Sequence, residues 1–141
     1  MSRFLIKTPP EFSAKMCVEF LLRSPKERLH RVEGDRIMKL IRYGEQLILF
    51  SVTPESKGLR VEVLTPEVER EHLDAIRQYV RFWFDLDTDL KPFYRLAKSD
   101  ELLKDIVKRY AGNRIVGQPD LYESLVWAVL GQQINLSFAY Q

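Results

Sequence analysis

The 141-residue sequence contains one cysteine, two histidines and six glycines, and it has no long apolar run. A single cysteine, Cys17, excludes an internal disulfide and a cysteine metal cluster. No glycine-rich phosphate loop and no G-x-S-x-G turn is present, which excludes the common nucleotide-binding and serine-hydrolase motifs. No stretch approaches the roughly 20 apolar residues that cross a bilayer, and the N-terminus lacks the apolar core of a signal peptide. These absences predict a cytoplasmic protein without membrane contact.

The residue types that hold metals are present but poorly arranged. His30 and His72 lie in different segments, and neither has a His or Cys partner at ligand spacing. Asp85, Asp87 and Asp89 alternate as in a calcium loop, but the glycine and the final glutamate of an EF-hand are missing. We therefore predict no metal site and interpret the acidic stretch as a solvated linker.

The net charge of +2 is unevenly distributed. Residues 1–44 carry ten Lys or Arg against five acids, whereas residues 45–141 carry twelve against fifteen. A basic N-terminal part is typical of a surface that meets phosphates, although a solvated charged surface has the same composition.

The first part of the chain predicts an α+β fold with an antiparallel sheet. Short β-rich runs separated by turns predict strands at residues 3–7, 29–32, 37–43, 47–53 and 59–64. Apolar spacing predicts helices at residues 13–23 and 66–85, the second with Thr65 as cap and Pro66 as first residue. The order β-α-β-β-β-β-α describes a meander whose buried face is covered by two helices.

The second part shows no strand signal. Helical patterns occupy residues 90–97, 100–110 and 121–130, and the last begins with a capping-box spacing of Asp120 and Glu123. An apolar segment starts again at Leu136, and the sequence stops inside it. We therefore expect a fragment, with an α+β domain at residues 1–88 and the start of an all-helical domain at residues 89–141.

Two further features have both a functional and an ordinary interpretation. The run Arg81-Phe82-Trp83-Phe84 has the aromatic density used to stack bases, but it also suits core packing at a domain junction. Three consecutive aromatic residues on a helix cannot all face the sheet. The amides that follow Gly131, on Gln132 and Gln133, either finish a helix in water or hydrogen-bond to base edges.

Three stretches resemble one known family. They are Pro9-Pro10-Glu11-Phe12 before a helix ending FLLRS, the segment RFWFDLDTDL, and the run ESLVWAVLGQQI. Together they are similar to DNA-3-methyladenine glycosylase II, of the helix-hairpin-helix superfamily of base-excision glycosylases. The resemblance implies an N-terminal domain like half of the TATA-binding protein, followed by a helical domain. It also implies binding of damaged double-stranded DNA, flipping of an alkylated purine and hydrolysis of its N-glycosidic bond, with no metal or nucleotide cofactor.

The same resemblance implies roles for three residues. Gln133 aligns with the wedge that fills the space left by the flipped base, Gln132 lies beside it, and Phe20 is a candidate for the base pocket. Core packing under the sheet is the other interpretation of Phe20. The hairpin pattern L-P-G-[VI]-G is not found in the 141 residues. We therefore assign no catalytic residue here, expect the catalytic aspartate beyond Gln141, and predict that this chain alone is inactive.

Two other functions stay open. One is an 8-oxoguanine glycosylase/lyase of the same superfamily, which requires a catalytic lysine downstream. The other is a non-catalytic module that binds DNA or a protein through its sheet domain.

Overall fold

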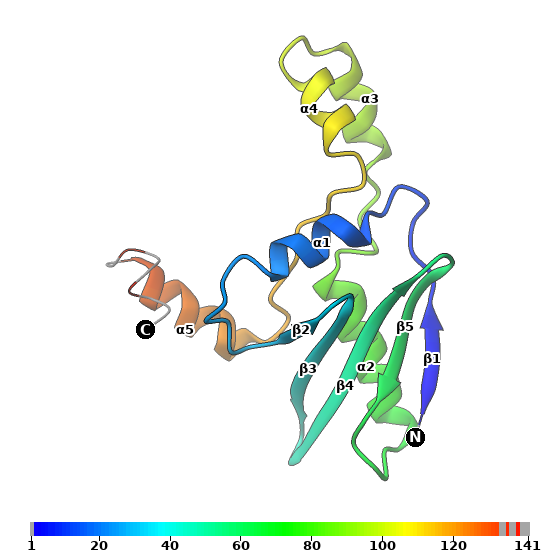
Figure 1. Ribbon diagram of the computed structural model, residues 1–141, viewed down its shortest axis with the longest axis vertical. Coiled ribbons are helices and arrows are strands. Elements are labelled where there is room, and N and C mark those ends of the chain that lie inside the picture. Colours follow the sequence, from blue (N-terminus) through cyan, green and yellow to red (C-terminus); the bar gives the residue numbers. More distant parts are fainter. Residues whose placement is uncertain (1, 133–134, 136–137, 139–141) are drawn as a thin grey trace.

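The computed structural model describes residues 2–132, 135 and 138. Its first part is one antiparallel sheet with two helices (Figure 1). The strands are β1 (Arg3–Ile6), β2 (Arg31–Glu33), β3 (Arg36–Tyr43), β4 (Gln46–Glu55) and β5 (Gly58–Val63). Helix α1 (Ala14–Leu21) separates β1 from β2, and α2 (Arg70–Trp83) follows β5. The predicted α+β class and the order β-α-β-β-β-β-α are confirmed.

The sheet has the strand order β1-β5-β4-β3-β2, with every neighbouring pair antiparallel. Strands β2 to β5 form the predicted meander, and β1 is added at the edge beside β5. Gly58 permits this addition, since a Cβ at this position would lie 2.1 Å from the carbonyl oxygen of Ile6. The edge strand therefore depends on a glycine at the start of β5.

One face of the sheet forms the core, as alternation along the strands requires. Helix α2 lies along this face and α1 crosses near one end of it (Figure 1). The two helices contribute Cys17 and Leu21 from α1 and Ile76, Val80 and Trp83 from α2. The sheet contributes the buried residues Ile6, Ile37, Ile48, Phe50, Val52, Leu59, Val61 and Val63.

The start of α2 differs from the prediction. The helix begins at Arg70 and not at Pro66, because the Thr65 hydroxyl is used elsewhere: it accepts a hydrogen bond of 2.8 Å from the main-chain nitrogen of Leu49. Glu67 then has a positive φ of 55°, which is incompatible with a helix. The first helical turn is closed instead by His72, whose Nδ1 accepts a hydrogen bond of 2.9 Å from the main-chain nitrogen of Glu69.

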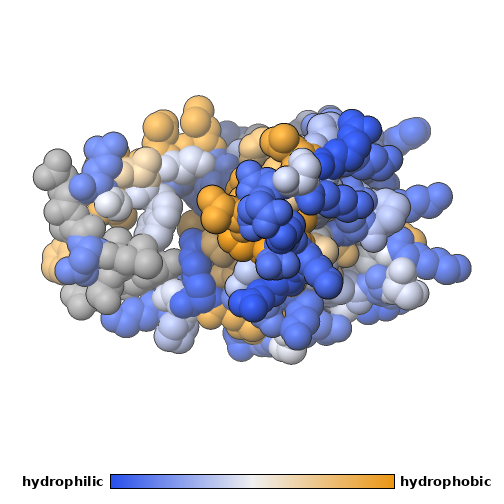
Figure 2. Space-filling view, turned by 90° about the horizontal axis from the view of Figure 1, so that it is seen from above, coloured by the Kyte–Doolittle hydropathy of each residue, from blue (hydrophilic) through white to orange (hydrophobic). Residues whose placement is uncertain are grey.

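Three helices follow, as predicted, and no strand occurs among the described residues after β5. They are α3 (Lys91–Ser99), α4 (Leu103–Arg109) and α5 (Leu121–Gln132). Helices α3 and α4 form a hairpin that extends away from the sheet, and α5 lies on another side of it (Figure 1). Figure 2 shows the molecule after a turn of 90° about the horizontal axis from Figure 1, so that it is seen from above. On this face, apolar groups lie among hydrophilic ones.

We call the sheet with α1 and α2, residues 3–83, the sheet unit. A buried arginine fixes the connection between the sheet unit and the three helices that follow. The Arg114 side chain has 0% exposure and donates hydrogen bonds to the carbonyl oxygens of Asp85, at 2.6 Å, and Thr88, at 2.7 Å. It also donates to the carboxylate of Glu11, at 3.1 Å. The segment before α5 is thus attached to the linker after α2 and to the segment before α1. Asp87 and Asp89 are exposed, as a solvated linker requires, and Asp87 pairs with Arg81. Asp85 differs from this prediction, since it is partly buried with its carboxylate 3.9 Å from the Arg114 guanidinium.

The aromatic run at the end of α2 divides as predicted. Trp83 and Phe84 are buried in the core, whereas Phe82 points away from the sheet with 62% of its surface exposed. None of the helices in the described part of the chain is long and apolar enough to cross a membrane.

Candidate functional site

A cavity of about 610 Å³ lies where the sheet unit meets α5. Its walls come from α1, the connection between α1 and β2, α2, the loop at residues 116–119 and α5. Aromatic side chains from the three helices converge on it, namely Phe20, Tyr79, Trp83, Tyr122 and Trp127. Convergence of several flat side chains suits a ligand with a planar ring.

Phe20 reaches this cavity because of the way α1 is seated. Ser13 caps the helix, with its hydroxyl 3.5 Å from the main-chain nitrogen of Met16. Cys17 and Leu21 point into the core, so Phe20 lies on the side of the helix that leaves it 44% exposed. The guanidinium carbon of Arg23 lies 4.2 Å from the centre of its ring. The structure therefore places Phe20 in the cavity and not under the sheet.

The wall contributed by α2 consists of Trp83, which is buried, and Tyr79, which is partly buried. His30 connects it to α1: its Nε2 lies 2.9 Å from the carbonyl oxygen of Leu21, and its ring meets that of Trp83 edge-on, with centroids 6.0 Å apart. Burial, reinforced by the nearby carboxylates of Glu123 and Asp120, raises the pKa of the Tyr79 phenol. Tyr79 therefore remains a neutral hydrogen-bonding group at any physiological pH.

The floor of the cavity holds an ion pair between residues 84 positions apart in the sequence. The ammonium group of Lys39, on β3, lies 2.9 and 3.1 Å from the two carboxylate oxygens of Glu123, on α5. The amide of Gln118 donates a further hydrogen bond of 2.8 Å to the same carboxylate. The Lys39 side chain is only 4% exposed and that of Glu123 is 22% exposed. This network attaches α5 to the sheet.

Sequence reasoning missed this pair, although one signal for it exists. Lys39 lies between Ile37 and Ile41 on the inward-facing side of β3, a position where an unpaired lysine is costly. The expected cap of α5 is present on one side, since the main-chain nitrogen of Glu123 donates to Asp120 at 2.8 Å. The Glu123 carboxylate is occupied by Lys39 and Gln118.

Helix α5 ends at Gln132, the residue predicted to lie beside the wedge. Gln132 is its last residue and is exposed, two positions after Leu130, which lines the cavity. Gln133 lies outside the described residues. Of the twelve residues of α5, none is buried, and the apolar residues Leu121, Tyr122, Leu125, Val129 and Leu130 are exposed.

A second cavity, of about 1030 Å³, lies between the end of α2 and the α3–α4 hairpin. Its lining includes Phe82, Phe93, Ile106 and Tyr110, which are all at least 45% exposed. The charged groups at its edge include Arg81 with Asp87, which pair with each other. Within the described residues, no three His, Cys, Asp or Glu side chains come close enough to hold a metal ion.

Comparison with known proteins decides the family. Residues 14–125 match the profile of the family described as "8-oxoguanine DNA glycosylase, N-terminal domain". The chain belongs to this family. The matched range includes Phe20, Lys39 and Glu123 of the cavity and ends inside α5, before Gln132.

Two relatives extend the comparison. The chain is 41% identical over 139 residues to the DNA-3-methyladenine glycosylase of Bacillus subtilis (strain 168), covering 96% of this chain and 46% of the relative. Its fold matches the 3-methyladenine DNA-glycosylase from Archaeoglobus fulgidus with a TM-score of 0.77 and 22% identity, covering 99% of this chain and 47% of the other. The chain thus spans about half the length of each. The similarity to DNA-3-methyladenine glycosylases that the sequence motifs imply is confirmed.

Proposed function

We propose that this chain is the N-terminal part of a DNA-repair glycosylase that removes alkylated purines, such as 3-methyladenine, from double-stranded DNA. The observation that carries the proposal is the aromatic cavity in which Phe20 of α1 meets the side chains of α5. Membership of the glycosylase family and the name of the Bacillus subtilis relative support the same reaction class, hydrolysis of the N-glycosidic bond.

The cavity suits a base that has left the helical stack. Flipping a nucleotide costs a few kcal/mol and is cheapest where damage has weakened the pair. A flipped purine regains stacking against Phe20 and the neighbouring rings. Because 3-methyladenine is cationic, it gains a further ~0.5–2 kcal/mol from the aromatic faces. Phe20 is therefore proposed as one wall of the base pocket.

The residues after Leu130 are proposed to replace the flipped base. Gln133 is proposed to enter the minor groove as the wedge, with Gln132 beside it facing the pocket. An amide fills the gap by hydrogen bonding to the orphaned base, because it offers both donors and an acceptor. In this proposal residues 1–88 form the α+β domain and residues 89–141 the start of the helical one.

The wedge is tested by Gln133→Ala in the 141-residue chain, with binding measured on a duplex containing an abasic site. Loss of one such hydrogen bond costs about 0.5–1.5 kcal/mol, which predicts affinity lower by about two- to tenfold. Gln78→Ala is the matched control, since Gln78 is an exposed amide on α2, far along the chain from α5. Equal affinities of the wild type and Gln133→Ala would refute the wedge assignment.

The catalytic aspartate is proposed to lie outside these 141 residues, because the hairpin that precedes it in the family is not found in them. No residue of this chain is assigned a catalytic role, and no cofactor is proposed. The purified chain is expected to release no base from alkylated DNA. Base release by the chain alone would overturn this part of the proposal.

A second function is favoured by the matched family, which is that of the 8-oxoguanine DNA glycosylase N-terminal domain. The full-length protein that contains these residues, assayed on duplexes carrying either lesion, separates the two reactions. Release of 3-methyladenine without strand cleavage supports the first, and release of 8-oxoguanine with strand cleavage supports the second. A folded full-length protein that releases neither base would contradict both and favour a non-catalytic binding module.

A further inference from the structure

The connection between α1 and β2 is the most basic loop of the sheet unit. Residues 22–30, LRSPKERLH, contain three Lys or Arg and one acid, a net charge of +2 with His30 neutral. The sequence alone places this charge in a loop, where it is typical of a solvated surface. The structure adds what the loop lies beside.

The loop forms one side of the cavity and faces α5. Arg23, Lys26 and Arg28 line the same cavity as Trp127 and Leu130, about 100 positions later in the chain. All three basic residues are exposed. Folding therefore brings cations of this loop to the same cavity as the last turn of α5.

The backbone of the loop is held in place by its own polar side chains. The Ser24 hydroxyl accepts a hydrogen bond of 3.2 Å from the main-chain nitrogen of Lys26. One carboxylate oxygen of Glu27 accepts two more, from the main-chain nitrogens of Arg28 and Leu29, both at 2.9 Å. The only acid of the loop is thus directed at the main chain, and the two neighbouring cations project from a fixed turn.

Lys26 and Arg28 have no carboxylate partner around the cavity. The Glu123 carboxylate on the floor is already paired with Lys39. Some basic residues elsewhere have carboxylate partners, such as Arg3 with Glu62 and Lys104 with Glu101. In the described part of the chain, neither Lys26 nor Arg28 forms a salt bridge. Arg23 differs from them, because its guanidinium lies over the ring of Phe20.

We propose that Lys26 and Arg28 bind backbone phosphates of the duplex whose damaged base enters the cavity. This inference rests on the proposed function and adds a contact to it, from the sheet unit to the DNA backbone. Duplex DNA carries one negative charge per about 1.7 Å of axis, so two exposed cations beside the pocket meet phosphates flanking a flipped nucleotide. Such contacts fix the register of the protein on the duplex and carry no sequence information.

The test compares the double variant Lys26→Gln/Arg28→Gln with wild type on a fluorescent duplex containing an abasic site, over 50 to 200 mM salt. Loss of two phosphate contacts lowers the slope of log affinity against log salt by about two. Over this fourfold range of salt, the variant is then expected to lose about tenfold less affinity than wild type. Lys26→Arg/Arg28→Lys keeps both charges and is expected to keep the wild-type slope.

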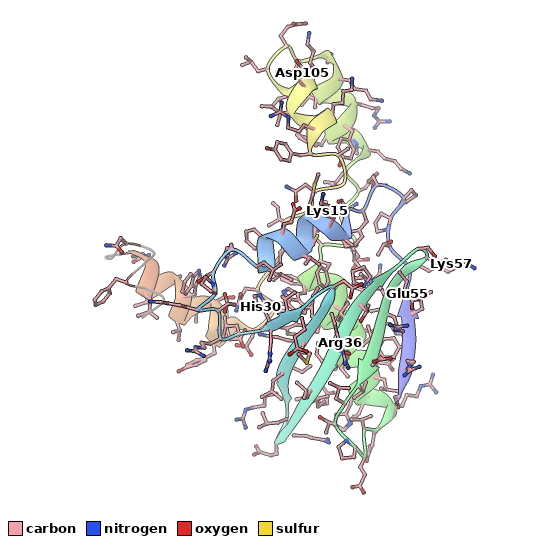
Figure 3. The ribbon with its side chains drawn as sticks, viewed as in Figure 1. Lys15, His30, Arg36, Glu55, Lys57 and Asp105 are labelled. Carbon is pink, nitrogen blue, oxygen red and sulfur yellow. The ribbon has the colours of Figure 1, made fainter. Side chains whose placement is uncertain are left out.

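The matched control is Lys57→Gln/Lys98→Gln, which removes two exposed cations that do not line the cavity. Lys57 lies at the turn between β4 and β5, well separated from His30 in Figure 3. This control is expected to leave the slope unchanged. Because all four positions are exposed, the thermal midpoints of both variants are expected to match wild type, which separates binding from folding.

Three outcomes overturn the inference. An unchanged slope in Lys26→Gln/Arg28→Gln, in a protein whose affinity still falls with Gln133→Ala, refutes the phosphate contact and leaves the proposed function intact. Absence of duplex binding by the wild type refutes the phosphate contact and the wedge contact in this chain. Reduced binding to anionic phospholipid vesicles with unchanged duplex binding assigns the two cations to a membrane surface and refutes the DNA contact.

Discussion

Removing the cation of the buried pair by Lys39→Met is predicted to detach α5 from the sheet. The substitution keeps the length of the side chain inside β3 but leaves the Glu123 carboxylate without its cation. Breaking a buried pair by removing one partner costs about 3–5 kcal/mol. Glu123 is 22% exposed and retains the hydrogen bond from Gln118, so the cost is expected at or below the bottom of this range, about 2–3 kcal/mol.

This free energy is expected to act on α5 and not on the sheet. None of the residues of α5 is buried, whereas the sheet retains its whole apolar core. A detached helix of twelve residues is marginal in water, so undocking exposes its amides. A loss of 2–3 kcal/mol predicts hydrogen exchange about 30- to 150-fold faster in α5, measured by mass spectrometry, with exchange in β3, β4 and β5 unchanged.

Two results would refute this reasoning. Unchanged exchange in α5 would show that the pair does not hold the helix, and equal acceleration in the sheet would show that it is part of the global core. The double variant Lys39→Met/Glu123→Leu gives the internal control, because replacing both charges by apolar groups is close to neutral. It is expected to restore most of the protection that Lys39→Met removes.

Two further predictions concern buried groups. Arg114→Met leaves three acceptors without their donor and is expected to lower the free energy of unfolding by about 3–5 kcal/mol in urea titration. Arg114→Lys should restore little of it, since one ammonium lacks the planar fork that reaches all three acceptors, and wild-type stability of this variant would contradict the assignment. Burial raises the pKa of the Cys17 thiol from 9.0 to about 11. The unfolded thiol ionises at lower pH than the buried one, so the contribution of Cys17 to the free energy of unfolding is present in full below pH 9. This contribution falls by about 3 kcal/mol as the pH rises to 11. Cys17→Ala should remove this pH-dependent loss of stability.

Local pattern predicted the sheet well because each strand carries its own signal. Leu59, Val61 and Val63 alternate with charged residues, and all three are buried on one face. The predicted start of α2 is wrong because the role of Thr65 depends on Leu49, a partner sixteen residues away. A threonine before a proline is a good helix cap by itself, and only the neighbouring strand shows that its hydroxyl is already bonded.

The cavity was harder to predict than the sheet because its parts are distant in the sequence. Family resemblance made Phe20 a pocket candidate, whereas its helical spacing with Cys17 and Leu21 favoured the core, and only the seating of the helix resolves the choice. Lys39 and Glu123 belong to different elements, and their meeting depends on where α5 lies. Arg114 is in a loop with no periodic pattern, so nothing in the local sequence predicts a fully buried guanidinium.

The two kinds of charge in this structure respond differently to salt, and this difference makes the binding test interpretable. Arg114 and the Lys39–Glu123 pair hold the walls of the cavity, and their side chains are largely removed from solvent. Buried pairs are screened much less than exposed ones, so the cavity keeps its shape between 50 and 200 mM salt. Lys26 and Arg28 are exposed and respond fully to screening. A change in the salt dependence of DNA binding on their substitution therefore reports phosphate contacts, and not a rearrangement of the pocket beside them.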